Sequence, residues 1–236
     1  MKPMYRGLML SIALILGTCL LPGSALAQEV VIDPADFGTV IDNPYWPLVP
    51  GTTFVYEAES DGELARIETE VTHMTKEILG VTATVILDRA WVDGVLEERT
   101  YDWYAQDLKG NIWYLGEATE ELDPSGNVIS TAGSWEAGVN GAEPGIIMLA
   151  DPKVGISYLQ EFLEGEAEDE ARILKLNARV STEFGDFEGC LKTKEYTRLS
   201  PGEVEHKYYC PGVGLVLVEE LKGKTVFEKL IEIIGP

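Results

Sequence analysis

Hydrophobic and polar residues alternate with a period of two along most of the chain after residue 50, a pattern typical of β-strands that bury one face. In the segment 64–74, Ala65, Ile67 and Val71 fall on one side, whereas Arg66 and its even-numbered neighbours fall on the other. No segment shows a sustained apolar period of 3.6 residues. The pattern therefore predicts an all-β protein.

Short turns divide this alternation into strands that follow one another as an antiparallel meander. Asp-Gly turns between β-rich segments are a strong hairpin signal, and they occur at Asp61-Gly62 and Asp93-Gly94. The most prominent hairpin is the aromatic segment Tyr101–Glu117, which turns at Lys109-Gly110-Asn111. The clearest expected strands are residues 52–59, 64–74, 81–92, 95–105, 112–117 and 225–234.

Short sequence matches follow one another in the same order in residues 51–117 and in residues 155–220. This order predicts two pseudo-repeats of five strands. For example, Trp103-Tyr104-Ala105 matches Tyr208-Tyr209-Cys210, and other short matches follow at similar offsets. Chance likeness between short β-patterns is the alternative. The period is far too long for a solenoid repeat.

We expect the pseudo-repeats to form a single β domain over residues 28–236. A five-strand sheet has one apolar face and two open edges, and both need cover. Two such sheets can join edges into a barrel or half-barrel, or pack as a clam; the pattern leaves barrel and sandwich open. Residues 118–154, rich in glycine and proline, would be a linker, and a last strand at 225–234 brings the total to about 11.

Residues 1–27 have the features of a cleavable signal peptide. Lys2 and Arg6 precede an apolar stretch at 8–21, and Ala25-Leu26-Ala27 is an A-x-A cleavage signal. An uncleaved membrane anchor is the alternative, but the apolar stretch is short and breaks at Pro22-Gly23. The sequence therefore predicts a secreted or periplasmic protein with no membrane span after cleavage.

Cys19 would be the acylated residue if the protein were a lipoprotein. Thr18 precedes it, where a lipobox has a small Gly, Ala or Ser. We therefore do not expect lipidation.

The chain is strongly acidic, with 40 Asp and Glu against 18 Lys and Arg, a net charge of −22. Removal of residues 1–27 takes two basic residues and no acidic one, which leaves 16 against 40 and a net charge of −24. Such a charge repels nucleic acid and anionic membranes, and favours solubility or attraction of cations. We expect no nucleic-acid partner, and the oligomeric state is open.

Two cysteines, Cys190 and Cys210, remain after signal cleavage. An even pair in an exported chain predicts one disulfide, with two buried free thiols as the alternative. A hairpin that turns at Pro201-Gly202 would bring them nearly opposite each other. The bridge would close a loop of about 20 residues, worth roughly 3 kcal/mol in the chain-entropy model.

Aromatic residues are the best candidates for a ligand site, because they crowd the last strands of both pseudo-repeats. Rings that face the space between the halves would line a pocket for an apolar or aromatic ligand. Ordinary core and cross-strand packing is the alternative. The candidate ligand-binding residues are Trp91, Trp103, Tyr104, Trp113 and Tyr208.

The most acidic stretch, residues 164–170, is the candidate metal site. Closely spaced hard oxygen ligands can hold Ca²⁺ outside the cell, and the candidates are Glu164, Glu166, Glu168 and Asp169. The stretch lacks the ligand spacing of an EF-hand, and a solvated turn between two strands is the alternative. We expect no other cofactor.

Catalytic motifs are absent from the sequence. It contains no nucleophile elbow, HExxH, phosphate-binding glycine loop or CxxC, and its two histidines, His73 and His206, fall in separate strands. We assign no catalytic residue.

Four stretches resemble a family of exported bacterial β-rich proteins with no known activity: DNPYWPLVPGTTFVYE, TYDWYAQDLKGNIWYLGE, GSWEAGVNGAEPGIIMLADP and EHKYYCPGVGLVLVEE. The resemblance implies an exported β-protein and supplies no activity. YYCPGVGLV also resembles a strand–turn–strand of periplasmic β-sheet lipid-binding proteins, which is an analogy of fold alone.

Three functions follow as hypotheses. The first is an exported non-enzymatic protein that binds a hydrophobic small molecule or lipid between its halves. The second is a structural or surface-interaction protein, with calcium binding as an added feature. The third is an enzyme whose site is assembled between the halves. An apolar cavity of several hundred Å³ favours the first, a solid core the second, and convergent polar groups with shifted pKa values the third.

Overall fold

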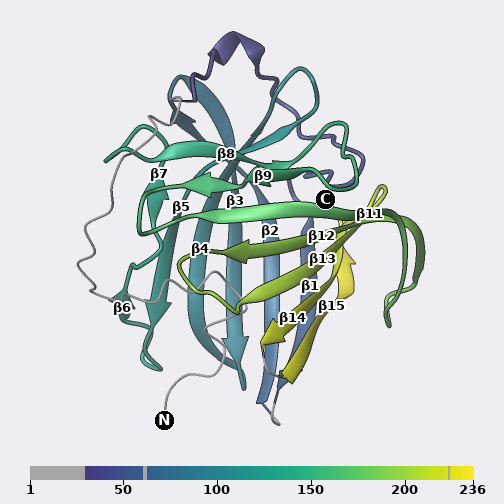
Figure 1. The fold of residues 1–236 in the computed structure, drawn as a ribbon. Coiled ribbons are helices and arrows are strands. Elements are labelled where there is room, and N and C mark those ends of the chain that lie inside the picture. Colours follow the sequence, from purple (N-terminus) through teal and green to yellow (C-terminus); the bar gives the residue numbers. More distant parts are fainter. Residues whose placement is uncertain (1–29, 61–62, 223) are drawn as a thin grey trace.

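The computed structural model describes residues 30–60, 63–222 and 224–236 (Figure 1). These residues form fifteen strands and a 3₁₀ turn, η1 (Pro34–Asp36). The strands are β1 (Thr53–Ser60), β2 (Glu63–Ile78), β3 (Val81–Val92), β4 (Val95–Gln106), β5 (Ile112–Leu122), β6 (Val128–Ser130), β7 (Trp135–Glu136), β8 (Glu143–Met148), β9 (Ser157–Leu159), β10 (Glu161–Phe162), β11 (Asp169–Ser181), β12 (Asp186–Thr197), β13 (Val204–Cys210), β14 (Gly214–Lys222) and β15 (Lys224–Ile234).

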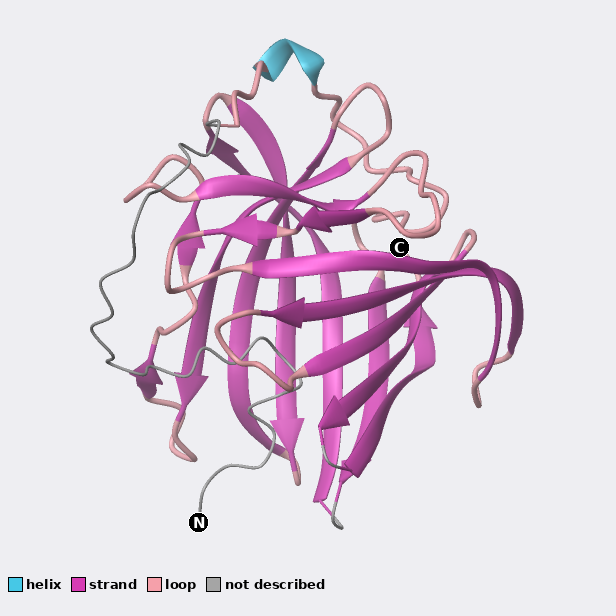
Figure 2. Ribbon diagram, viewed as in Figure 1, coloured by secondary structure: helices cyan, strands magenta, loops and turns pink. Residues whose placement is uncertain are grey.

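All strands belong to one antiparallel sheet that curls into a nearly closed barrel (Figure 2). Thirteen strands follow one path, in the order β10-β8-β5-β4-β3-β2-β1-β15-β14-β13-β12-β11-β9, and β6 and β7 pair with β5 beside it. The two end strands, β9 and β10, are separated in sequence only by Gln160. The chain itself therefore joins the two ends of the sheet, and the all-β antiparallel prediction is confirmed.

The barrel has two walls, each a meander. Strands β1–β5 form one wall, and β11–β14 cross in front of them at a steep angle in Figure 1. Strand β15 pairs with β1 on one side and β14 on the other, which joins the walls. Residues 51–117 form β1-β2-β3-β4-β5, and residues 155–220 form β9-β11-β12-β13-β14 together with β10, which pairs with β8 instead. Apart from β10, each series lies in order in the sheet.

The two series also begin with similar glycine turns, at Gly51 and Gly155. Gly51 has φ 90° and donates its N–H to the carbonyl of Val71 at 2.7 Å; Gly155 has φ 91° and donates to the carbonyl of Ile173 at 2.9 Å. Both turns need a left-handed residue, which favours glycine. Duplication of one ancestral unit stays a prediction.

The predicted count of about 11 strands was too low, because residues 118–154 are more than a linker. Strand β5 continues to Leu122, and β6, β7 and β8 pair with it in succession. These strands contain only two to six residues each, so their alternation is too brief to stand out in the sequence.

Close backbone contact seals the barrel between β8 and β10. Pro144 pairs with Glu161, and a Cβ on Gly145 would lie 2.3 Å from the backbone carbonyl of Gln160. Only glycine allows this approach. Gly145 therefore positions the segment that connects the two walls.

The segment before β1 packs its aromatic residue between the walls. The ring of Trp46 lies 5.2 Å from that of Tyr104 on β4 and 5.8 Å from that of Tyr209 on β13. These two tyrosines hold matching places in the predicted repeats. The carbonyl of Pro44 accepts a hydrogen bond from Gly212 at 2.8 Å, so the segment contacts both halves.

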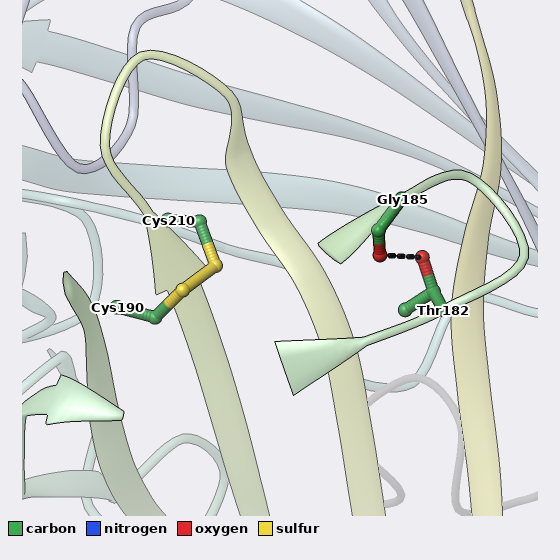
Figure 3. The surroundings of a disulfide bond; sticks show 4 residues. All are labelled: Thr182, Gly185, Cys190 and Cys210. Atoms are coloured by element: carbon green, nitrogen blue, oxygen red, sulfur yellow. Dashed lines mark hydrogen bonds between the residues drawn. A yellow bond between two sulfur atoms is a disulfide. The ribbon is translucent and has the colours of Figure 1, made fainter. Parts of the chain in front are cut away.

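The predicted disulfide is present (Figure 3). Cys190 on β12 and Cys210 on β13 are bonded, with Cα atoms 4.2 Å apart and a sequence separation of 20. Leu191 pairs with Tyr209 in the ladder, which places the cysteines opposite each other as expected. Both are buried.

Two expectations lie outside the described residues: the signal peptide at 1–27, including Cys19, and the Asp61-Gly62 turn. Within the residues that the structure describes, no helix has the length and apolar character needed to cross a bilayer.

Candidate functional site

A partly open cavity of about 150 Å³ lies between the two walls of the barrel. One part of the lining is aromatic: Trp46, Tyr56, Tyr104, Tyr114 and Tyr209. The rings of Tyr104 and Tyr114 lie 4.8 Å apart, and Trp46 contacts Tyr104 and Tyr209. These rings come from both halves and from the segment before β1, so the cavity exists only when the barrel is assembled.

The rest of the lining is unusually acidic. Nine carboxyl groups and one ammonium group face the cavity among the described residues. The carboxyl groups belong to Asp88, Glu98, Asp102, Glu117, Glu161, Asp169, Glu195, Glu205 and Glu228, and the ammonium group to Lys207. Charged groups are costly to remove from water unless they are paired, so this imbalance needs a physical explanation.

Lys207 forms ion pairs with two of these carboxyl groups. Its Nζ lies 3.0 Å from Glu195 and 3.3 Å from Glu205, and the Tyr209 hydroxyl donates to Glu195 at 3.3 Å. Burial alone would lower the pKa of Lys207, but the adjacent carboxylates outweigh burial and raise that pKa well above its ordinary value. Lys207 is therefore charged, and its charge is paired with Glu195 and Glu205.

Asp88 and Asp102 form a carboxyl pair on neighbouring strands. The Tyr114 hydroxyl donates to Asp102 Oδ1 at 2.5 Å, and Asp88 lies close enough for its charge to act on Asp102. Burial is the main cause that raises the pKa of Asp88 to about 6 and that of Asp102 well above its ordinary value, and the repulsion of Asp88 adds to the rise at Asp102. Protonation of one of the two carboxyl groups relieves this repulsion.

Glu161 is the most isolated of the nine. Its side chain is fully buried, and neither carboxyl oxygen has a hydrogen-bond partner in the described part of the chain. The Trp135 indole N–H lies close enough to act on its charge but does not reach hydrogen-bond geometry. Burial and then the charge of Asp169 raise the pKa of Glu161 well above its ordinary value.

Glu161 acts on Glu117 of β5, and Asp169 of β11 acts on Glu161. Burial, followed by the charge of Glu161, raises the pKa of Glu117 well above its ordinary value. Burial is also the main cause that raises the pKa of Asp169 to about 6. Next to them, Gln160 is buried and its Nε2 makes no hydrogen bond within the described residues. This end of the cavity therefore holds several polar groups that lack partners.

The remaining carboxyl groups titrate near neutrality for the same reason. Burial is the largest cause that raises the pKa of Glu98 to about 7, of Glu205 to about 7 and of Glu228 to about 8. Since several of these values lie within the physiological range, the charge of the cavity varies with pH.

Of the five aromatic residues predicted to bind ligand, Tyr104 lines this cavity and the other four lie elsewhere. Lys76 Nζ sits 3.2 Å from the ring centre of Trp103, and Arg89 lies 5.6 Å from that of Trp91. The Trp113 indole donates to Asp107 at 3.0 Å. Tyr208 donates to Glu219 at 2.9 Å. Ligand binding by these residues stays a prediction.

The acidic stretch predicted as a metal site does not converge. Glu164 and Glu166 are exposed in the turn after β10, and Glu168 accepts a hydrogen bond from the Gly165 N–H at 2.9 Å. Asp169 instead faces the barrel interior. Across residues 30–60, 63–222 and 224–236, no three His, Cys, Asp or Glu side chains are arranged to hold a metal ion. Calcium binding remains a prediction without geometric support.

Sequence analysis missed the acidic interior, although one signal was present. Thr100, Asp102 and Tyr104 occupy alternate positions of β4, so they lie on one face of the strand, and all three are buried. A strand that places a carboxylate on the same face as its core aromatic residue indicates a polar cavity.

The comparisons with known proteins supply no family. No family model matches the chain, and none of the curated proteins matches it. Among solved structures, it is similar to the crystal structure described as that of "a putative lipoprotein from Parabacteroides distasonis", with 13% identity, a TM-score of 0.43, and coverage of 81% of this chain and 99% of the other. So distant a likeness supports no functional argument. It also gives no support to the expectation that Cys19 is not lipidated.

Proposed function

We propose that this protein is an exported, non-enzymatic binding protein that encloses one small molecule inside its barrel. The observation that carries the proposal is the cavity inside the barrel, lined from both walls by aromatic rings in contact with one another and by polar groups without partners among the described residues. Buried polar groups normally have hydrogen-bond partners. A site that leaves several unsatisfied is prepared for a ligand or for ordered water that supplies those partners.

The size of the cavity limits the ligand. Sites for drug-sized ligands have volumes of roughly 300–1,000 Å³, whereas this cavity has a volume of about 150 Å³. A molecule of few heavy atoms fits such a space. The aromatic rings would pack against its apolar part, and the polar groups would set its orientation.

The hydrophobic ligand or lipid predicted from the sequence is a less suitable occupant. An apolar molecule would satisfy none of the carboxyl groups, and a full acyl chain needs a larger space. The aromatic part of the lining, centred on Tyr104 and Tyr114, still supports an apolar portion within the ligand.

A second candidate function is acid–base catalysis, because the Asp88–Asp102 pair has the convergent polar groups and shifted pKa values expected of an enzyme. A carboxyl group and a neighbouring carboxylate can donate and accept protons in one reaction. Turnover of a bound molecule, lost in Asp102→Asn and retained in Glu188→Gln on the exposed surface, would favour this function over simple binding.

Native mass spectrometry of the mature protein purified from its own host tests the binding proposal. We expect a recurrent small molecule in about one copy per chain, released on unfolding. A chain with no bound molecule, together with no thermal shift across a library of small metabolites, would refute the proposal.

A further inference from the structure

We propose that the ligand of the barrel is a small aliphatic amine, held through an ammonium group at Glu161. This inference rests on the proposed binding function and names the chemical class of the ligand. It is argued from charge balance, from the unpartnered oxygens of Glu161 and from the shape of the cavity.

The charge balance of the cavity calls for a cation. Lys207 pairs with Glu195 and Glu205, so seven lining carboxyl groups are left. None of those seven forms an ion pair with a lysine, arginine or histidine within the described residues. In the empty cavity burial raises the pKa of these groups and so favours their neutral form. An ammonium group would favour the charged carboxylates and lower that pKa, which a neutral or anionic ligand cannot do.

Among the cavity carboxyl groups, Glu161 is the best candidate to bind the cation. Both of its oxygens are buried and lack hydrogen-bond partners among the described residues. An ammonium group carries three N–H donors and no acceptor, which suits two empty carboxylate oxygens and an adjacent carboxylate such as Glu117 or Asp169. Charge-assisted hydrogen bonds of this kind are the strong ones in proteins.

The backbone holds Glu161 in place for this role. It lies in β10, whose pairing with β8 depends on the close approach at Gly145. A carboxylate on a strand that closes the barrel cannot move easily to find another partner. The site is therefore built into the fold and is not a mobile surface cluster.

The aromatic lining suits the other part of such a ligand. Tyr114 packs edge-to-face on Trp135, with ring centres 5.2 Å apart, and Tyr114 also contacts Tyr104. Methylene groups pack on these rings, and an ammonium group is attracted to their faces. A cavity of about 150 Å³ accommodates a short aliphatic monoamine or diamine.

Cadaverine is the probe, with 1,5-pentanediol as its neutral counterpart, glutarate as its anionic counterpart and CaCl₂ as a hard cation. The protein is first dialysed under acidic conditions, which protonate the carboxyl groups and release a bound cation. Calorimetry at neutral pH then measures binding to the full mature chain. We expect cadaverine to bind with a stoichiometry of one, and the two organic counterparts to show no heat.

Glu161→Gln tests the placement. We expect it to weaken cadaverine binding at least tenfold, because it removes a charge-assisted contact. Glu188→Gln, on the exposed face of β12, is the matched control and should bind as the unmodified protein does. If Glu161→Gln does not fold, Glu117→Gln replaces it with the same expectation.

The possible results separate the two proposals. Binding of pentanediol or glutarate in preference to cadaverine, or of calcium without cadaverine, would overturn the amine inference and leave the binding function standing. Cadaverine binding that is equal in Glu161→Gln and Glu188→Gln would overturn the assignment of the ammonium to Glu161. No binding of any probe, with no molecule released from the native protein, would remove both.

Discussion

Replacement of Glu228 by glutamine should stabilise the ligand-free protein at alkaline pH. Glu228 lies on β15, is 8% exposed and faces the cavity. Burial, followed by the charge of Glu205, raises its pKa from 4.5 to about 8. The folded protein therefore holds this proton more tightly than the unfolded chain does.

The sign of the effect follows from linkage. A carboxyl group with a raised pKa contributes most to stability when it is protonated in both states, below about pH 4.5. That contribution is lost as the pH rises from about 4.5 through about 8, because the unfolded chain releases this proton while the folded protein still holds it. Each pKa unit corresponds to about 1.4 kcal/mol, which gives an upper limit of about 5 kcal/mol over the whole window. The effective dielectric constant of buried protein sites, about 20, lowers the cost of the charge, so we expect about 2–3 kcal/mol.

Urea unfolding at two pH values measures this difference. At about pH 5, Glu228→Gln and the unmodified protein should have similar free energies of unfolding, and at about pH 9 the variant should be more stable by about 2–3 kcal/mol. Glu188→Gln, which is exposed, should follow the unmodified protein throughout. Parallel pH profiles for Glu228→Gln and the unmodified protein would show that the interior carboxyl groups do not govern stability, and the reasoning about the cavity would fail.

Three further predictions concern the fold that encloses the cavity. Removing the Cys190–Cys210 disulfide as a double alanine variant should lower the free energy of unfolding by about 3 kcal/mol, measured in urea, because it frees a loop of 20 residues; an unchanged midpoint would contradict this. Gly145→Ala should destabilise the protein by about 1–3 kcal/mol or more, because its Cβ meets the backbone of Gln160, whereas Gly38→Ala, whose Cβ would meet no atom closer than 3.9 Å, should cost less in the same thermal melt. Trp46→Ala should cost about 3 kcal/mol and expose Tyr104 and Tyr209, which near-UV circular dichroism detects; an unaltered spectrum would argue against its place between the walls.

Local features of the fold were predictable from the sequence. Strand β3 begins and ends at the predicted residues, Val81 and Val92. The Asp93-Gly94 turn that follows has positive φ at both residues, 48° and 81°, as a tight hairpin of this type requires. The Cys190–Cys210 disulfide was predicted from the even number of cysteines and from the hairpin that brings the two residues opposite each other. In each case the determining interactions lie within about twenty residues.

Features that depend on distant contacts were not predictable. The short strands β6, β7 and β8 exist because β5 offers them an edge, and β10 exists because Gly145 allows close approach. Alternation shows that Asp102 shares a face with Tyr104 but does not show whether that face is filled by side chains or hollow. The acidic cavity results from the way two walls meet, and that arrangement is not contained in any one strand.

The most direct test of the account is a crystal structure of the mature protein grown with cadaverine. The account predicts electron density for one extended molecule inside the barrel, with an ammonium nitrogen within hydrogen-bond distance of the Glu161 carboxylate and methylene groups against Tyr104 and Tyr114. A barrel that contains only water, or cadaverine bound only on the outer surface, would contradict it.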